Sequence, residues 1–360
     1  MRVRQTTDNR RQAASLKVLG LVFLLSVVSG SLSAQDVHFT QFFTTPLATN
    51  PAHTGNFNGN YRIGFNFKAQ WPWAIQQGST YNYHTETPYI DFSFGERKIK
   101  TGWMGVGFNF LNDQAGDGML TYRRATLSFA YHQTFDEDHK YVLSAGANVS
   151  YVNRLIDFSK LYFNNQWVED IGFNTLLDPN EQYKRESFDM WDVGAGLNFR
   201  GQVHHMINLS LGFSMLHLNR PKHSFYNGDE RLGLRYQANT TVQIKTSDRF
   251  FVDVDGYYTF EKKASQIAFG SKVGYSMYNW KTNDLDHTVY AGIYYRVKDA
   301  LSPMIGYQFQ RTRLLVSYDV VLSKLVRPGR ANGGPEISLV HVGAWGQNHY
   351  NGTKVYCPKF

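Results

Sequence analysis

The chain has 360 residues, a formal net charge of +8, 16% aromatic residues and a single cysteine. A lone cysteine excludes an internal disulfide framework, and a chain this rich in Tyr and Phe has the composition of strands rather than of helices. The length suits one large all-β domain, because barrels and sandwiches often exceed the usual size of a single domain.

Residues 1–34 have the organisation of a secretory signal peptide. Five basic residues precede an apolar run from Val18 to Val28, and small residues then lead to a predicted cleavage site before Gln35. Cleavage removes five positive charges and the negative charge of Asp8, which lowers the net charge from +8 to +4. We therefore expect an exported protein with no nucleic-acid partner.

Residues 35–60 form an amino-terminal segment that precedes the first predicted strand. Its apolar side chains need cover from water; they are Phe39, Phe42, Phe43 and Leu47. Two arrangements provide that cover: a plug that folds into the lumen of a barrel, or a strap that packs beneath the barrel on the periplasmic side. The sequence leaves both open.

The stretch YRIGFNFKAQW, residues 61–71, alternates apolar and polar side chains with a period of two, which is typical of a strand with two unlike faces. The pattern recurs in segments that begin at Tyr141, Trp191, Leu232, Phe250, Ile267, Thr288, Leu314 and Glu336. Weaker candidates lie near Tyr89, Gly102, Arg124, Ile207 and Met304. Together they predict about 14 strands within residues 61–345, an even number that suits a closed bacterial barrel.

A soluble β-sandwich also alternates, with its apolar face in the core. Aromatic residues at the ends of the apolar faces, such as Tyr141, Tyr151 and Trp191, favour a membrane barrel, because interface girdles lie at those positions. We therefore predict an all-β, transmembrane, antiparallel outer-membrane β-barrel. Long links at 72–87, 152–187, 217–231 and 323–334 alternate with short ones, as expected if the short turns face the periplasm.

One link, between Ser276 and His287, is longer than this rule predicts, so we also expect the register to slip after Tyr275. Charged residues fall on the predicted inward faces: Asp91, Asp192, Asp253, Asp255, Asp319, Arg62, Lys68, Arg200, Arg235, Lys245 and Lys272. They would either line a track for a passing ligand or pair across the lumen and close it. Pairing is favoured, because neighbouring opposite charges offset the cost of desolvating each other.

Residues 152–187 form the longest predicted outer loop, and residues 346–360 form a carboxy-terminal tail. The loop combines aromatic residues with charges, a composition suited to binding a protein partner; the aromatic candidates are Tyr162, Phe163, Trp167 and Phe173. The alternative is a loop that folds over the mouth of the barrel and caps it.

We expect no catalytic, cofactor or metal site. His204 and His205 are adjacent, so on a strand they point to opposite faces and cannot jointly bind one ion without a turn. A short periplasmic turn with solvated histidines is favoured over a metal site. The spacing of His341, His349 and Cys357 matches no tight ligand motif. Neither a nucleophile elbow nor a phosphate-binding loop is present in the sequence.

The sequence resembles the PorP/SprF family of type IX secretion system membrane proteins from Bacteroidota. The resemblance rests on AQDVHFTQFFTTPLATNPAHTG with YRIGFNFKAQW, on WDVGAGLNF with LGFSMLHLNRP, and on SYDVVLSKL, NGGPEISLVHVG and CPKF near the end. It implies an outer-membrane barrel that helps to secrete proteins to the cell surface, in some members large adhesins used in gliding. The tail departs from the family's Pro-Arg-Phe in having Lys359, and TLLDPNEQYKRESFDM matches no part of the family's pattern.

Three functions follow as hypotheses. The first is a non-enzymatic component of the type IX secretion system, whose partners are other secretion components and a large secreted surface protein. The second is an outer-membrane channel for a hydrophobic or oligosaccharide small molecule, since barrels of about 14 strands also suit that role. The third is a structural outer-membrane protein with no transport role.

Overall fold

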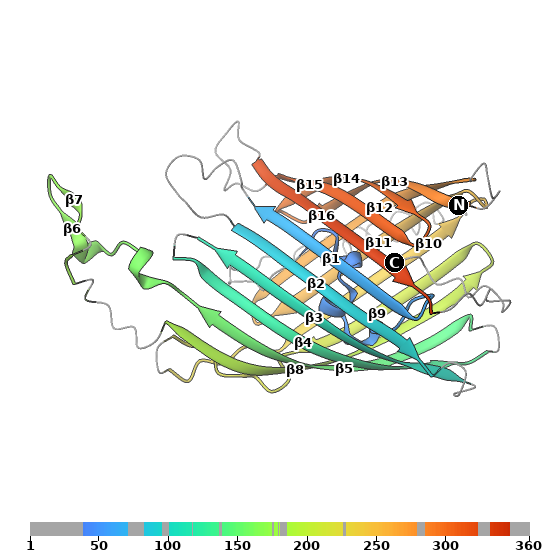
Figure 1. Ribbon diagram of the computed structural model, residues 1–360, viewed down its shortest axis with the longest axis horizontal. Coiled ribbons are helices and arrows are strands. Elements are labelled where there is room, and N and C mark those ends of the chain that lie inside the picture. The colour runs from blue at the N-terminus through green and yellow to red at the C-terminus, as the bar shows by residue number, and fades with distance from the viewer. Residues whose placement is uncertain are drawn as a thin grey trace, which may run out of the picture.

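The computed structural model describes residues 39–70, 83–95, 101–116, 118–136, 139–174, 176–178, 180, 186–225, 228–278, 285–322 and 332–345. The predicted signal peptide, residues 1–34, and the predicted tail, residues 346–360, lie outside these residues. Fourteen antiparallel strands close into one barrel (Figure 1), which confirms the predicted fold class and strand number.

The strands follow one another around the barrel in chain order, and β1 pairs with β16 to close it. The bounds are β1 Tyr61–Gln70, β2 Tyr83–Phe94, β3 Gly102–Ala115, β4 Leu120–Thr134, β5 Tyr141–Leu155, β8 Ser187–His204, β9 Ile207–Leu216, β10 Arg235–Lys245, β11 Phe250–Glu261, β12 Ala264–Tyr278, β13 Leu285–Arg296, β14 Ala300–Phe309, β15 Thr312–Val321 and β16 Asn332–Gly343. Between β5 and β8 the chain leaves the barrel wall and forms a separate two-stranded sheet, β6 Trp167–Val168 and β7 Gly172–Phe173.

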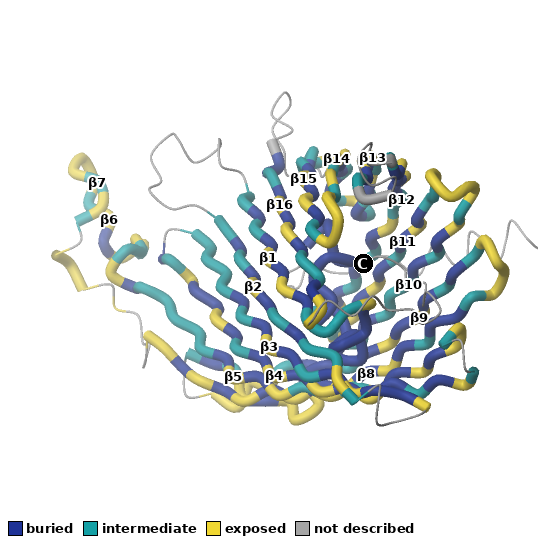
Figure 2. Tube along the Cα trace, turned by 45° about the vertical axis from the view of Figure 1, so that its right-hand side comes forward, coloured by how far each residue is buried: buried dark blue, intermediate teal, exposed yellow. Residues whose placement is uncertain are grey.

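Buried residues alternate with more exposed ones along the strands (Figure 2), as expected when side chains point alternately to the lumen and to the outside of the barrel. In β1, Phe65 on the outside is 39% exposed, whereas Arg62 on the inside is 1% exposed. So many large apolar side chains on the outer face would be unfavourable in water, whereas they are favourable in lipid. Among the described residues, no helix is long and apolar enough to cross a membrane.

The end of the apolar surface is visible on β5 and β8, the longest pair in the wall. Tyr151 and Trp191 lie opposite each other and pack edge to face, with ring centroids 5.4 Å apart. One outward position further along, Asn153 donates a hydrogen bond of 2.8 Å to Asp189. Aromatic rings followed by a polar pair are the order expected at a membrane–water interface.

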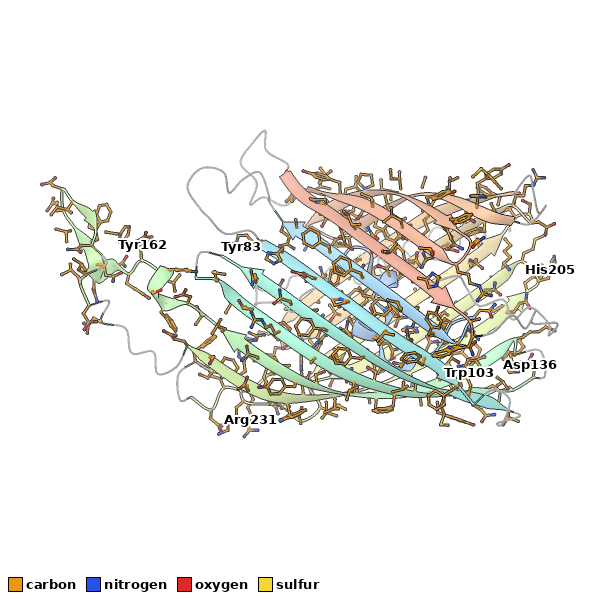
Figure 3. The ribbon with its side chains drawn as sticks, in the orientation of Figure 1. Tyr83, Trp103, Asp136, Tyr162, His205 and Arg231 are labelled. Carbon is orange, nitrogen blue, oxygen red and sulfur yellow. The ribbon has the colours of Figure 1, made fainter. Side chains whose placement is uncertain are left out.

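The two ends of the barrel differ in their connections. Four long connections, at 71–82, 156–186, 217–234 and 322–331, lie at one end, which we call the loop end. Figure 3 shows Tyr83, Tyr162 and Arg231 at this end and Trp103, Asp136 and His205 at the opposite end, which we call the turn end.

The register irregularity expected after Tyr275 lies at the end of β12. Tyr275 pairs with Val289 in unbroken register, and the irregularity comes later, between Met277 and Tyr278. The link between β12 and β13 lies at the turn end. It covers only residues 279–284, because β12 and β13 extend beyond Ser276 and His287, so it is no longer than the link at 95–101 and is not the exception that the sequence indicated.

Candidate functional site

Residues 39–57, which we call the lumenal segment, lie inside the barrel. The segment contains three short helical turns, η1 Phe42–Thr44, α2 Pro46–Thr49 and η2 Pro51–His53. Prolines at the first positions of two of these turns fix φ for a helical start and remove donors that would lack partners there. Almost every residue of the segment is buried, so the wall of the barrel encloses it (Figure 2).

The beginning of the lumenal segment binds the wall near the loop end. The amides of Thr40 and Gln41 donate to the two carboxylate oxygens of Glu336, at 2.9 and 2.8 Å. The Gln41 side chain donates to Ser317 Oγ at 2.8 Å and accepts from Ser338. These bonds satisfy backbone donors at a point where no strand or helix can do so.

A network of buried ion pairs lies next to these hydrogen bonds. Lys68 Nζ is 3.0 Å from Asp319 Oδ2 and 3.7 Å from Glu336 Oε2. Arg296 reaches the same Asp319 oxygen at 3.1 Å and also donates to Thr40 Oγ1 at 2.9 Å. Four charges from four strands therefore neutralise one another around the start of the segment.

The end of the lumenal segment binds the wall near the turn end. Arg62 forms two bonds to Asp91, at 3.0 and 2.7 Å, and Asp91 also accepts from the amide of Gly55 at 2.8 Å. His132 donates to the carbonyl of Thr54 at 2.8 Å, and Trp103 donates to the carbonyl of Gly55 at 2.9 Å. The segment therefore runs through the lumen from the loop end toward the turn end and is bonded along its length.

Gly55 permits the close approach of the segment to β3. Its φ is +71°, and a Cβ at this position would lie 2.5 Å from the Cα of Gly105. Only glycine tolerates both the dihedral angle and the contact.

The four apolar residues predicted as anchors all lie in the lumen. Phe42 and Phe43 stack on Tyr257 and Tyr294, with centroids 5.3 and 5.2 Å apart. Phe39 packs in a second buried cluster, with Leu111, Tyr122, Val152, Phe188 and Met190. Leu47 is 1% exposed. The apolar side chains of the segment thus pack on aromatic side chains of the wall, in a lumen that is otherwise mostly polar.

His53 is a titratable group that the sequence analysis did not single out. Burial and then the charge of Arg62 lower the pKa of its imidazole to about 3, because both disfavour the protonated ring. Asn239 donates to its Nε2 at 3.1 Å. The lumenal segment therefore holds this histidine in its neutral form.

The predicted inward charges are buried with one exception, since Lys245 is half-buried at the end of β10. Several of them form close pairs, among them Lys272 with Asp255 at 2.7 Å and with Asp253 at 3.3 Å. Glu336 and Arg296 belong to the same networks but were not predicted. Glu336 does alternate with Ile337 in the sequence, and that pattern would have placed it on the inward face.

The predicted partner-binding residues lie at the loop end, on a structure that projects away from the barrel (Figures 1 and 3). We call residues 158–178 the projecting segment. Trp167 and Phe173 are paired across β6 and β7, with ring centroids 4.9 Å apart. Tyr162 packs on Phe173 at 5.1 Å. Tyr162, Trp167 and Phe173 are 64, 58 and 46% exposed.

Phe163 differs from the other three predicted residues, because its side chain is half-buried and its amide bonds to Gln166 Oε1 at 3.2 Å. Apolar neighbours that were not predicted extend the exposed surface: Ile171, Leu176 and Leu177. Two further bonds hold the segment in shape, from the Asn174 amide to the Gln166 carbonyl at 2.7 Å and from Gln166 Nε2 to the Leu177 carbonyl at 2.9 Å.

The remaining histidines with a neighbouring titratable group lie near the two ends of the barrel. His204 ends β8 and His205 follows in the turn, with ring centroids 3.9 Å apart. Within the described part of the chain, no three His, Cys, Asp or Glu side chains are arranged to hold a metal ion. His217 lies 3.0 Å from Asp192 in a buried pair beside the loop end.

A family model described as "Type IX secretion system membrane protein PorP/SprF" matches residues 31–340. Similar solved structures include the CymD monoaromatic hydrocarbon channel, with a TM-score of 0.47 and 9% identity over 84% of this chain and 93% of that chain. A FadL homologue of Pseudomonas aeruginosa has a TM-score of 0.48 and 9% identity over 81% of this chain and 91% of that chain. No curated protein sequence matches the chain.

Proposed function

We propose a secretion function for this chain, which belongs to the PorP/SprF family of type IX secretion system membrane proteins and is an outer-membrane β-barrel. In this proposal the protein is a non-enzymatic component that binds a secreted partner, such as a large adhesin, and supports its export or its anchoring at the cell surface. The longer connections of bacterial barrels face the exterior, so the loop end and its projecting segment would meet the partner outside the cell.

The observation that carries the proposal is the exposed aromatic surface of the projecting segment. Phe173 contacts both Tyr162 and Trp167, yet all three residues remain about half exposed. Such a surface is unfavourable in water unless a partner covers it, and aromatic residues dominate the binding energy of protein interfaces. The projection of the segment away from the barrel end also weighs against the alternative of a cap over the mouth.

The lumenal segment bears on the alternative of a small-molecule channel. Its polar bonds and aromatic contacts occupy the space that a solute would cross. A solute pathway would require these buried ion pairs to separate, which leaves uncompensated charges in the lumen. We therefore favour partner binding over solute transport.

The first experiment compares the surface and culture-fluid proteomes of a deletion strain and a complemented strain, with the integrity of the outer membrane checked in both. Selective loss of one or a few large surface proteins is the expected result, and these proteins define the client. An unchanged secretome together with a defect in uptake of a solute would overturn the proposal in favour of a channel.

A second experiment tests the projecting segment. A Trp167→Ala/Phe173→Ala variant is expected to insert into the outer membrane normally and to lower client display at the surface at least about tenfold, because hot-spot aromatics carry much of an interface's energy. Phe135→Ala is the matched control, since Phe135 is 64% exposed but lies in a turn at the opposite end. Normal client display in the double variant would exclude this surface as the binding site.

A further inference from the structure

Beyond its first turn, the projecting segment carries charge of one sign only. Its one basic residue, Lys160, lies in that first turn and pairs with Asp157 at 3.3 Å. From residue 161 to residue 178 the sequence contains three acidic residues, Glu169, Asp170 and Asp178, and no Lys, Arg or His. The chain as a whole has the opposite balance, with 37 Lys and Arg against 29 Asp and Glu. The exposed aromatic surface of the projecting segment is therefore also an acidic one.

The structure brings the carboxylates and the rings together. Glu169 and Asp170 form the turn between β6 and β7, and both are exposed. Asp170 has a φ of +67°, and the Ile171 amide closes the turn on the Val168 carbonyl at 3.3 Å. The turn joins the two strands whose paired residues are Trp167 and Phe173. Two exposed carboxylates thus lie in the turn that joins the strands carrying these rings.

A cation over an aromatic face is attracted by the ring, and a nearby carboxylate adds a charge–charge attraction. The same arrangement repels an anionic membrane surface, because the acidic turn would approach lipid headgroups of like charge. We propose that the client presents a surface on which Lys or Arg side chains lie among apolar groups. These basic side chains dock between the rings and the carboxylates of the projecting segment. The inference rests on the proposed function and specifies the partner's chemistry.

The test uses the full-length protein and the client that the deletion strain fails to display. A charge-reversal variant, Glu169→Lys/Asp170→Lys, is compared with the neutral variant Glu169→Gln/Asp170→Asn, which keeps side-chain shape, and with Trp167→Ala/Phe173→Ala. Migration of the unheated barrel on a denaturing gel checks folding in each. Client display is measured in cells, and binding of the purified client is measured at about 50 and 500 mM salt.

We expect charge reversal to lower client display about tenfold, the neutral variant to lower it a fewfold, and high salt to weaken wild-type binding but not binding to the neutral variant. If both charge variants display the client normally while the aromatic variant does not, the inference is wrong and the proposed function stands. If the aromatic variant also displays the client normally, the proposed function fails at this surface. Binding of the charge-reversal variant that equals or exceeds wild type would likewise overturn the inference.

Discussion

The lumenal segment and the projecting segment use the same kinds of side chain in opposite ways. Phe42 and Phe43 stack on tyrosines of the wall and are 5 and 6% exposed, whereas Tyr162 and Trp167 are 64 and 58% exposed. Both sets make ring contacts with centroids about 5 Å apart. The difference lies in what surrounds the rings: the lumen supplies partners to the first set, and no described part of the barrel covers the second.

The contrast extends to charge. Carboxylates near the lumenal segment have buried cationic partners, as Asp91 has Arg62 at 2.7 Å. The carboxylates of the projecting segment are exposed, and two of them lie in the turn between the strands that carry Trp167 and Phe173. The first region therefore explains how the barrel is filled and held, and the second offers a surface whose apolar area and charge call for another molecule.

The largest effect is expected from removing the central cation of the lumenal network. In Lys68→Met, Asp319 and Glu336 lose a buried partner, so the free energy of unfolding should fall by about 3–5 kcal/mol. Urea titration of the folded barrel measures this. Lys222→Met is the matched control, because Lys222 pairs with Asp229 at 2.8 Å but is 63% exposed, and no measurable change is expected. Equal behaviour of the two variants would mean that the network does not hold the lumenal segment.

The two sets of aromatic residues should respond oppositely to truncation. Phe42→Ala removes a ring that packs on Tyr257 and Tyr294 and should lower the free energy of unfolding by about 3 kcal/mol. Phe173→Ala should change it by less than about 0.5 kcal/mol but should lower client display. Denaturant titration and surface proteomics of both variants separate the two outcomes. A stability loss in Phe173→Ala as large as in Phe42→Ala would erase the distinction between the regions.

The fold could be predicted from sequence because lipid and lumen select opposite side chains at alternate positions. Each strand from Tyr61 to Gly343 repeats this selection, so the period of two survives errors at individual ends. Strand ends were predicted less well: the strand expected from Leu232 begins at Arg235. Whether a residue near a strand end belongs to the strand or to the loop depends on its pairing with the adjacent strand. A single sequence does not show that pairing.

The sites were predictable in part. The aromatic residues of both segments were evident from composition, but the sequence left open whether residues 35–60 fill the lumen or pack beneath the barrel. That choice depends on partners more than 200 residues away, such as Glu336 for the amides of Thr40 and Gln41. Contacts of this separation leave no local pattern. The acidic character of residues 161–178, in contrast, is present in the sequence and needed only to be compared with the rest of the chain.

A smaller effect should follow from acid. In the unfolded chain His53 takes up a proton near pH 6.5, whereas in the folded protein its pKa is about 3. The unfolded state therefore binds more protons between these values, so stability is fully present above pH 6.5 and falls as the pH is lowered through this window, by about 1.4 kcal/mol per pH unit. From pH 7 to 5 the contribution of His53 is a loss of about 2 kcal/mol.

His53→Gln keeps an acceptor for Asn239 without a titratable ring, so its stability should fall less than that of the wild type over the same range. Urea titrations at pH 7 and 5, with hydrogen exchange in residues 39–57, measure the difference. Identical pH dependence in both proteins would show that His53 is not held neutral in the lumen.

The smallest effect is expected at the turn of the projecting segment. Asp170 occupies the left-handed region, with a φ of +67°, where glycine is unstrained and alanine costs about 1 kcal/mol. Asp170→Ala and Asp170→Gly remove the same charge, so the difference between them reports the geometry of the turn alone. Hydrogen exchange of the Ile171 and Asn174 amides, which close this structure, should be faster in the alanine variant, while the unfolding midpoint of the barrel stays unchanged in both.

Client binding should then be weaker in the alanine variant than in the glycine variant, because Trp167 and Phe173 are held in register by this turn. Equal binding would mean that the rings act without being pre-organised.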